Sequence, residues 1–557
     1  MIKYITQQYI KPFLSIFRRL LKIKMACSTE DYIEEVICET SDILENHPKT
    51  FKLGEGEILL IKQNNVISAL GSRCTHYGGP LVNGALGNGR IRCPWHGACF
   101  DLTTGDIEDF PGRLDSLPCY KVTVDGENVK VRASIADLRH NKRKKNMVKR
   151  NRVSNDSVVV IGGGPAAAVC VETLRQELYD GRITMICQEK YLPYDRTKCT
   201  KQMDFTICDG QLRNGPFYHS HDIDIMKSVE AVSVNTKTKT VKLSNNKTLQ
   251  YTKLFIATGN SPKRIAVKGE DLKNIFLLRN YDHSKILYSA LSKDKRMVVI
   301  GGGFIGMEVA DFCADKVKKI TLVMRYDKPL KYVFGNEIGG VLMKLFTKKG
   351  IEFVPNVNVV NFIGCDKVES VNLSDGSSLP ADLVVIGVGV EPNSAFLENS
   401  GIHLKSDGTI ITNSRLETNV PNVFAGGDVA CAPIWSHNNE KASVGHFALA
   451  HYHGRIAGLN IAGKETELRS IPFFWTKMAG YSIRYCGFGN FDHIVDAAGS
   501  YEEMKFLFIY LKNEKVVAMS SCNMDPYVSK FAELVQQGKH LTRADVCPCD
   551  GILKWAS

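Results

Sequence analysis

Two glycine-rich segments, each lying between an apolar strand and a predicted helix, restrict the fold of this 557-residue chain more than any other feature. One is SVVVIGGGPAAAVCVETL and the other is MVVIGGGFIGMEVADF. In such loops the first glycine permits a tight turn, the second lets the backbone approach a pyrophosphate, and a third small residue lets the helix lie close to the strand. The N-terminus of the helix then faces the phosphates. The segments predict two dinucleotide sites, with Gly162, Gly164 and Ala167 in the first and Gly301, Gly303 and Gly306 in the second.

The sequence around these loops alternates between strands and helices, which predicts parallel sheets with crossover helices. After the first loop, the strand ITMIC leads to Glu189, a candidate acceptor for a ribose hydroxyl of the first nucleotide. The second loop lies within the sequence span of the first domain. This order indicates a reductase that binds two dinucleotides.

Two pairs of soft metal ligands precede both glycine loops. Cys74 and His76 form one pair, and Cys93 and His96 form the other. Four such side chains can hold one zinc ion tetrahedrally, or a [2Fe–2S] centre in which one iron takes two thiolates and the other takes two imidazoles. Zinc fingers usually pair cysteine with cysteine and histidine with histidine, whereas each loop here supplies one of each. The mixed loops therefore favour a two-iron cluster, and short β-branched runs around them predict a small β domain.

The composition is that of an ordinary globular protein, with 44% hydrophobic and 23% charged residues. The 17 cysteines are scattered, which favours reduced thiols in an intracellular compartment. The net charge of +12 comes from two segments, because residues 1–24 and 139–152 carry fourteen basic residues and no acidic ones. The rest of the chain is near neutral, so a nucleic-acid-binding face is not indicated.

The N-terminal segment MIKYITQQYIKPFLSIFRRLLKIK has apolar residues at helical spacing with basic residues between them. Charges interrupt every apolar run well short of the ~20 residues that a membrane span needs. Such a segment fits a mitochondrial leader, an anchor at a membrane surface, or an ordinary packed helix. The leader interpretation predicts a mitochondrial protein, with the cytoplasm as the alternative. The second basic segment, 139–152, is interpreted as a solvated linker rather than a nuclear address.

The chain resembles pyridine-nucleotide-dependent flavoprotein reductases of the apoptosis-inducing-factor and ferredoxin-reductase type, with a Rieske domain fused at the N-terminus. CTHYGGP and CPWHGACFDLTTGD are similar to the two cluster loops of Rieske domains. They lack the extra cysteines of the high-potential respiratory type, so they resemble the ferredoxin or oxygenase type. The resemblance implies three cofactors: FAD, NAD(P)H and a [2Fe–2S] cluster. It implies that the metal ligands are Cys74, His76, Cys93 and His96.

The resemblance also implies roles for residues outside the glycine loops. LPYDRTKCTK is similar to the family's flavin-contact segment, which implies that Arg196 binds FAD and that Lys201 forms a catalytic pair with Glu308 beside the flavin. Asp428 corresponds to the carboxylate that reaches the ribityl chain, and Trp475 to a tryptophan that approaches the flavin. A surface Lys–Glu pair and a core tryptophan are the alternatives.

Two departures from the related reductases bear on the chemistry. Where disulfide reductases carry a second redox cysteine five residues after the first, this chain has Asp204 after Cys199, so electrons are expected to leave the flavin without a dithiol relay. Cys547 and Cys549 are a less favoured substitute. At the end of the nucleotide-domain strand ITLVMRYDKP, NADH users commonly place Glu, whereas this chain has Met324 followed by Arg325. A guanidinium there favours a 2′-phosphate, which predicts that NADPH is used at least as well as NADH.

The implied function is that of an NAD(P)H-dependent FAD oxidoreductase, which passes hydride to flavin and then single electrons to the Rieske cluster and an external acceptor. That acceptor is a protein or a small molecule, and the alternative function is an NAD(P)H-sensing signalling protein in cell death whose turnover is incidental. A homodimer, and membrane-surface contact through the N-terminal segment, are compatible with the sequence; nucleic-acid binding is not expected. The predicted fold is multidomain, with an all-β Rieske domain, an α/β two-dinucleotide flavoreductase and a C-terminal α+β domain. Its predicted divisions are the leader (1–29), the Rieske domain (30–135), the linker (136–155), the FAD domain (156–280 and 396–464), the NAD(P) domain (281–395) and the C-terminal domain (465–557).

Overall fold

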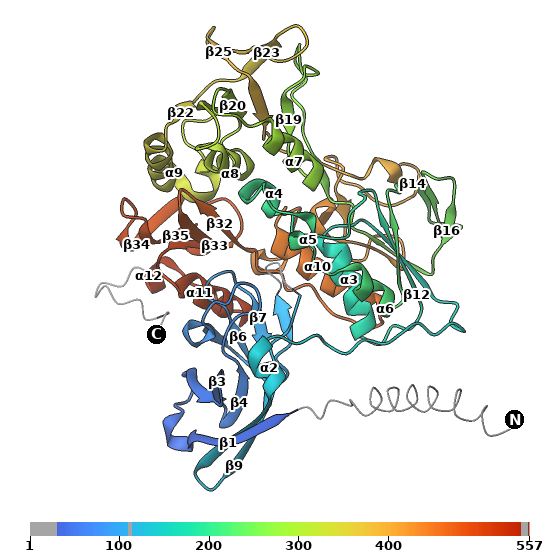
Figure 1. Ribbon diagram of the computed structural model, residues 1–557, viewed down its shortest axis with the longest axis vertical. Helices are drawn as coiled ribbons and strands as arrows, with labels where there is room; N and C mark the ends of the chain where they lie inside the picture. The colour runs from blue at the N-terminus through green and yellow to red at the C-terminus, as the bar shows by residue number, and fades with distance from the viewer. Residues whose placement is uncertain (1–30, 110–113, 547–554, 556–557) are drawn as a thin grey trace, which may run out of the picture. The chain divides into compact units, whose positions relative to one another are not determined.

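The computed structural model describes residues 31–109, 114–546 and 555 (Figure 1). The predicted leader and the Cys547–Cys549 pair lie outside the described residues. The described residues form two compact units, one made of residues 31–72 with 117–143 and the other of residues 73–109, 114–116, 144–546 and 555. In the described part of the chain no helix is long and apolar enough to cross a membrane.

The first unit is built on an antiparallel six-stranded sheet in the order β1-β10-β9-β4-β3-β2. A two-residue turn at Asn64 and Asn65, both with positive φ, closes the β3–β4 hairpin, as the twist of paired strands favours. Ser134 caps the short helix α2 (Ile135–His140). The sheet confirms the predicted β-rich texture, and its strands are β1 (Tyr32–Glu39), β2 (Lys49–Leu53), β3 (Gly56–Gln63), β4 (Val66–Gly71), β9 (Cys119–Asp125) and β10 (Asn128–Ser134).

The segment 73–116, which contains both Cys/His pairs, belongs to the second unit. It carries a small antiparallel sheet in the order β5-β6-β7-β8. The predicted Rieske domain at 30–135 is therefore shared between the two units. Its metal loops belong to the same unit as the reductase part of the chain. The strands are β5 (Ala85–Gly87), β6 (Arg90–Arg92), β7 (Cys99–Asp101) and β8 (Ile107–Asp109).

The first dinucleotide segment folds into a parallel sheet in the order β13-β12-β11-β17-β29. Strand β11 reads SVVVI and is buried along almost its whole length, as a strand covered on both faces must be. Its last strand, β29, comes from a distant part of the chain, so the chain returns to this sheet after building another. The elements are β11 (Ser157–Ile161), α3 (Pro165–Gln176), β12 (Arg182–Cys187), β13 (Ile223–Lys227), β17 (Lys253–Ile256), β29 (Val423–Ala425), α10 (Phe447–Ile461) and the added sheet β14 (Ala231–Asn235), β15 (Thr240–Leu243) and β16 (Thr248–Gln250).

The second dinucleotide segment folds into its own parallel sheet in the order β19-β26-β20-β21-β22. Helix α8 follows the second glycine loop as α3 follows the first. The elements are β19 (Ile275–Leu277), α7 (Tyr281–Ala290), β20 (Arg296–Ile300), α8 (Phe304–Cys313), β21 (Lys319–Val323), α9 (Lys331–Lys348), β22 (Ile351–Val354), β26 (Leu383–Ile386) and the added sheet β23 (Val359–Ile363), β24 (Ser370–Leu373) and β25 (Ser378–Pro380).

The C-terminal part is an antiparallel sheet in the order β32-β33-β36-β35-β34, followed by two helices. In Figure 1 helix α11 lies beside strands β6 and β7 of the metal-loop sheet, and it packs on β5. The elements are β32 (Phe473–Met478), β33 (Tyr481–Gly487), β34 (His493–Ser500), β35 (Lys505–Lys512), β36 (Lys515–Cys522), α11 (Tyr527–Gln536) and α12 (Arg543–Val546).

Several short elements join these sheets. The predicted linker contains an ordered ion pair, because Lys145 lies 3.0 Å from Asp106 and 3.5 Å from Glu177. The remaining elements are α4 (Lys198–Lys201), α5 (Ile207–Gly210), α6 (Gly215–Ser220), β18 (Asn260–Pro262), β27 (Val390–Pro392), β28 (Ile410–Ile411), β30 (Ala430–Ile434), β31 (Glu440–Ala442) and 3-10 turns at 40–42, 81–83, 395–397, 427–429 and 435–437.

Candidate cofactor pocket and cluster site

A pocket of about 600 Å³ opens at the first glycine loop, at the carboxyl ends of β11 and β12. Gly162 has a φ of 135°, and a Cβ there would collide with the carbonyl oxygen of Ala257. A Cβ on Gly164 would meet open space, so the backbone at the start of α3 is accessible from the pocket. Ala167 is fully buried on α3 and does not line the pocket, as expected for the residue that lets helix and strand approach. The loop is thus an open cradle for a pyrophosphate.

Glu189 and Arg196, which were predicted to bind FAD, both line this pocket and form an ion pair with each other. The hydroxyl of Tyr194 donates to Glu189 Oε2 at 2.7 Å. Burial acts to lower the pKa of the Arg196 guanidinium, but the surrounding acidic groups and Tyr194 raise it, so the cation is retained. The ion pair holds both side chains on the wall of the pocket, after the end of β12.

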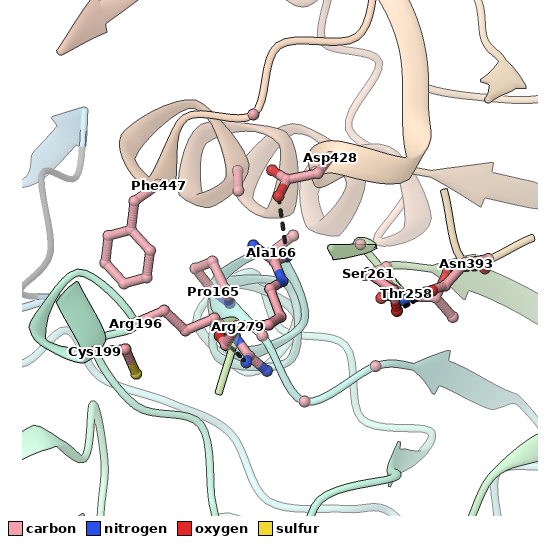
Figure 2. A pocket seen from close by; sticks show the side chains of 18 of the residues that line it. Pro165, Ala166, Arg196, Cys199, Thr258, Ser261, Arg279, Asn393, Asp428 and Phe447 are labelled. Carbon is pink, nitrogen blue, oxygen red and sulfur yellow. Dashed lines mark hydrogen bonds and ion pairs between the residues drawn. The ribbon is translucent and has the colours of Figure 1, made fainter. Parts of the chain in front are cut away.

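Asp428 lies across the pocket and forms an ion pair with Arg279 at 3.1 Å (Figure 2). Arg279 was not predicted from the sequence. No spacing rule points to it, because it follows β19 of the other sheet and reaches the pocket only in the folded chain. Its guanidinium nitrogen lies next to Gly259, which also lines the pocket. Together with Arg196 and Lys201 it gives the pocket a third cation, one that can pair with a phosphate.

The predicted catalytic pair forms at the inner end of the same pocket. Lys201 Nζ lies 2.7 Å from Glu308 Oε1, and Glu308 is nearly inaccessible to solvent. Two hydroxyls complete the carboxylate's shell, with Thr200 donating to Oε2 at 2.6 Å and Thr476 to Oε1 at 2.9 Å. Three donors, one of them the Lys201 ammonium, fix the position of the carboxylate. The alternative of an exposed surface pair is therefore wrong for Glu308.

His446 also lines the pocket and was missed by the sequence interpretation. It precedes helix α10, and its ring packs on Phe474 with the centroids 4.6 Å apart. Burial lowers the pKa of its imidazole to about 4, although Asp428 acts in the opposite direction. The ring is consequently neutral at physiological pH and can donate or accept one hydrogen bond toward a ligand.

The second glycine loop repeats the geometry of the first. Gly301 has a φ of 113°, and a Cβ on it would collide with the Gly387 carbonyl oxygen. A Cβ on Gly303 would meet open space, and one on Gly306 would collide with the loop's own backbone. Like the first loop, this one has an open backbone at the N-terminus of its helix.

Met324 and Arg325 follow strand β21 beside the second loop. Met324 is buried beneath Gly302, whereas Arg325 is exposed and donates to the Tyr326 hydroxyl at 2.8 Å. The guanidinium also lies over the Tyr326 ring, 4.8 Å from its centroid. By strand register Arg325 corresponds to Gln188 in the first domain, which lines the first pocket. The register thus places Arg325 at the edge of the second nucleotide site.

The four predicted metal ligands converge on one side of the metal-loop sheet. The thiols of Cys74 and Cys93 are hydrogen-bonded to each other, and both are buried. The imidazole rings of His76 and His96 lie 4.9 Å apart. The two loops share one backbone conformation, because in each the cysteine N–H donates to the carbonyl five residues later and its carbonyl accepts from the glycine four residues later. Each loop thus presents one thiol and one imidazole.

This donor set fits a two-iron cluster better than a single ion. Among the described residues no position is surrounded by three or more His, Cys, Asp or Glu side chains. A tetrahedral zinc site needs four protein ligands around one ion. In a Rieske centre each iron takes only two protein ligands, paired thiolates on one side and paired imidazoles on the other. The thiol pair and the imidazole pair seen here have that arrangement.

Trp475 lies between the cluster loops and the pocket. Its ring centroid is 4.3 Å from that of His96 and 6.4 Å from that of His76. The same residue lines the pocket, and Lys201 Nζ lies 5.7 Å from its ring centroid. Hence Trp475 contacts both the pocket and a cluster loop, and it is not simply a core tryptophan.

The cluster loops are attached to the C-terminal part of the chain by a buried ion pair. Arg92 Nε lies 2.6 Å from Glu533 Oε1 on α11, and each side chain is only 3% exposed. Arg92 also pairs with Asp109 at 2.9 Å and donates to the Gly97 carbonyl at 2.9 Å. Burial acts to lower the pKa of the Arg92 guanidinium, but neighbouring negative groups, Glu533 first, raise it well above its usual value. The guanidinium therefore stays charged inside the contact.

Further hydrogen bonds connect the loops directly to the reductase part. The Ser529 hydroxyl donates to the Cys93 carbonyl at 3.1 Å, and Arg484 Nε donates to the Trp95 carbonyl at 3.2 Å. On another side, Arg213 pairs with Asp115 at 2.7 Å and with Glu172 of α3 at 2.9 Å. Contacts from α11, from β33 and from Arg213 thus attach the segment that carries the loops to the reductase part.

The comparisons with known proteins agree with this geometry. Residues 156–454 match the pyridine nucleotide-disulphide oxidoreductase family, and residues 34–121 match the Rieske [2Fe-2S] domain. The chain belongs to the pyridine nucleotide-disulphide oxidoreductase family. It is 38% identical to human apoptosis-inducing factor 3, over 93% of this chain and 86% of that protein.

A curated relative and a solved structure are similar to the reductase part of the chain. The ferredoxin–NAD(+) reductase subunit of the benzene 1,2-dioxygenase system of Pseudomonas putida is 30% identical, over 59% of this chain and 80% of the subunit. The solved ferredoxin reductase for the CYP199A2 system of Rhodopseudomonas palustris superposes with a TM-score of 0.68 at 27% identity, covering 72% of this chain and all of that structure. The expected fold is confirmed, as are the three cofactors: FAD, NAD(P)H and a [2Fe–2S] cluster. The chain is an NAD(P)H-dependent flavoprotein oxidoreductase with a Rieske domain.

Proposed function

We propose that this reductase delivers electrons from NAD(P)H, through FAD, to its own Rieske cluster, and that Trp475 connects the two sites. When bound, FAD takes a hydride from the nicotinamide and gives up its two electrons singly, and the cluster carries one electron at a time. The observation that carries the proposal is the position of Trp475, which lines the pocket and packs against His96.

The residues of the pocket have distinct tasks in this proposal. Gly162, Gly164 and the N-terminus of α3 would hold the pyrophosphate, with Glu189 on the adenosine ribose. Asp428 and Arg279 would bind the chain between pyrophosphate and ring system. Lys201, fixed by Glu308, would place a positive charge near the ring system, where it stabilises negative charge that develops on reduction.

The proposal is tested with the full-length holoprotein, purified with flavin and iron bound. Visible absorption and EPR spectra are recorded before and after anaerobic addition of NADPH. We expect the flavin absorption to bleach and a Rieske-type EPR signal to appear in the same sample. Bleaching without the EPR signal, in protein with full iron content, would refute internal transfer and favour the signalling alternative.

We also propose that NADPH serves at least as well as NADH. Arg325 is an exposed cation held by Tyr326. It stands next to Met324, the position where NADH users are expected to place a carboxylate. A planar guanidinium binds phosphate bidentately, and it cannot repel a 2′-phosphate as a carboxylate does. A hundredfold preference for NADH in steady-state flavin reduction would contradict this proposal.

Replacing Arg325 with leucine is expected to raise the KM for NADPH roughly tenfold to a hundredfold, because one charge-assisted hydrogen bond of about 1.5–3 kcal/mol is lost. The KM for NADH should change little. Arg182→Leu is the matched control, because Arg182 is an exposed, ion-paired arginine at the start of a strand in the other dinucleotide domain. An equal rise in both KM values for Arg325→Leu would mean that this side chain does not contact the 2′-phosphate.

The cellular location and assembly belong to the same proposal. The basic, acid-free segment at residues 1–24 supports a mitochondrial protein. The pocket, Trp475 and the cluster loops all come from one chain, so the proposed route needs no second subunit. The acceptor that finally takes the electrons must reach the cluster loops from outside.

A further inference from the structure

The two cluster loops have the same backbone conformation but opposite surroundings. Gly78 and Gly97 occupy equivalent places at the loop tips, and each has a φ of 75°. A Cβ on Gly97 would lie only 2.7 Å from the Phe473 ring, so this tip is covered by the C-terminal sheet. Among the residues that the structure describes, none has an atom within 4 Å of a Cβ placed on Gly78. One loop tip is therefore docked on the reductase, and the other is open.

The two histidines differ in the aromatic side chain that lies nearest to each. His96, in the docked loop, packs on Trp475 with the ring centroids 4.3 Å apart. His76, in the open loop, is 6% exposed, and its ring lies 4.0 Å from that of Tyr77. The Tyr77 side chain is 48% exposed, which is high for so large an aromatic residue. Tyr77 is thus an aromatic bridge between a predicted iron ligand and solvent.

The docked loop cannot serve both the reductase and an outside acceptor in this arrangement. Its tip is covered by Phe473, its backbone is hydrogen-bonded to Ser529 and Arg484, and Arg92 beside it is paired with Glu533. A buried ion pair adds little net affinity, because the cost of desolvating both ions offsets their attraction. Arg92 and Glu533 nevertheless satisfy each other only while the loop is docked. The acceptor must therefore approach the open loop.

We propose that electrons leave this protein at Tyr77 and Gly78, and that the acceptor is a one-electron redox protein which docks on this loop tip while the other loop stays on the reductase. The inference rests on the proposed function, since it assigns the outlet of the same route. In each outward step one electron leaves the reduced cluster and enters the acceptor. Two acceptor molecules are consumed per NAD(P)H, and no covalent bond forms or breaks.

The shape of the outlet favours a protein over a small molecule. Small molecules bind in concave sites that bury most of their surface, whereas the Gly78 tip faces open space. Electron-transfer proteins form small, transient interfaces, for which a loop with an exposed aromatic residue is sufficient. Tyrosine is among the residues that most often carry the binding energy in such contacts.

The test separates the outlet from the internal route. Holoprotein is reduced either with NADPH or with dithionite, and reoxidation of the cluster is followed by stopped-flow after mixing with oxidised cytochrome c or with ferricyanide. We expect Tyr77→Glu to slow reoxidation by cytochrome c roughly tenfold or more, as loss of a central interface residue does. Tyr77→Phe, which keeps the ring, should behave like the unaltered protein. Tyr32→Glu is the matched control, because Tyr32 is 50% exposed on β1, outside the cluster loops.

Each outcome decides one question. Normal reoxidation of Tyr77→Glu by cytochrome c would overturn the inference while leaving the proposed function intact. Failure of NADPH to reduce the cluster, combined with a Tyr77 effect after dithionite reduction, would overturn the proposed function and leave the outlet standing. Reoxidation by ferricyanide alone, with no reaction of cytochrome c, would contradict a protein acceptor.

A measurement that does not depend on turnover checks the geometry. A soluble nickel–EDTA chelate speeds the relaxation of the reduced cluster's EPR signal according to how closely it approaches. We expect Tyr77→Ala to increase this effect, because removing the ring opens the His76 edge to solvent, and Tyr32→Ala to leave it unchanged. An unchanged relaxation in Tyr77→Ala, in protein with normal cluster content, would show that solvent reaches the cluster from another side.

Discussion

Replacing Glu533 with leucine is expected to leave NADPH reduction of the flavin intact and to slow reduction of the cluster by about a hundredfold. Glu533 is the carboxylate on α11 that pairs with Arg92 beside the docked cluster loop. Removing one partner of a buried ion pair typically costs about 3–5 kcal/mol, because the other charge stays buried without compensation. The lower end of that range applies here, since Asp109 still pairs with Arg92. A loss of about 3 kcal/mol shifts the docking equilibrium by roughly a hundredfold.

The measurement is anaerobic stopped-flow, with the flavin followed by absorption and the cluster by freeze-quench EPR. Two variants make the result specific. Glu514→Leu removes an exposed carboxylate paired with Arg543 and should change neither rate, because exposed pairs contribute little. The double variant Arg92→Met with Glu533→Leu replaces both charges with apolar side chains and should recover much of the cluster reduction. Equal slowing in the single and double variants would mean that the charges do not hold the loop in place.

The glycine loops, the metal pairs and the hairpins are predictable from sequence because each is built from contiguous residues. A strand, a turn and a helix N-terminus that bind a pyrophosphate lie within about fifteen positions of one another. Gly162 and Gly301 adopt a positive φ that residues with side chains rarely adopt. A glycine at these places in the sequence therefore indicates the backbone conformation of the loop directly. The Lys201–Glu308 pair was predicted instead from the family resemblance. In the structure Lys201 Nζ lies 2.7 Å from Glu308 Oε1.

The contacts that connect the domains were not predictable, since nothing local identifies them. Arg92 and Glu533 are separated by 441 positions, and each lies in a segment whose own pattern shows only a strand or a helix. Arg279 reaches the first pocket from the other sheet, and it is recognisable only after both sheets are placed. Such contacts fix the metal loops against the reductase part. The basic linker alone would have let the loops move relative to it.

Replacing Trp475 with leucine should have the second large effect, and it should act on a different step from Glu533→Leu. The indole fills the space between the pocket and His96, with ring centroids 4.3 Å apart, and Lys201 lies over its face. Leucine is too short to touch both sides, so a gap opens between the two sites while the cluster loop stays docked through Arg92 and Glu533. We expect reduction of the cluster to slow on the order of tenfold to a hundredfold, the scale of loss that about an ångström of misplacement causes.

Because docking is preserved, the Trp475 variant differs from the Glu533 variant in ways that can be measured. Trp475→Phe keeps an aromatic ring and should retain most of the rate, whereas Arg92→Met with Glu533→Leu should not rescue Trp475→Leu. The nickel–EDTA relaxation of the cluster should rise in Glu533→Leu, which exposes the docked loop, and stay nearly unchanged in Trp475→Leu. If Trp475→Leu raises that relaxation as much as Glu533→Leu does, the indole holds the loop in place rather than carrying electrons. The structure favours the electron-carrying role, since the docked loop has two other attachments, at Ser529 and Arg484, that do not involve the indole.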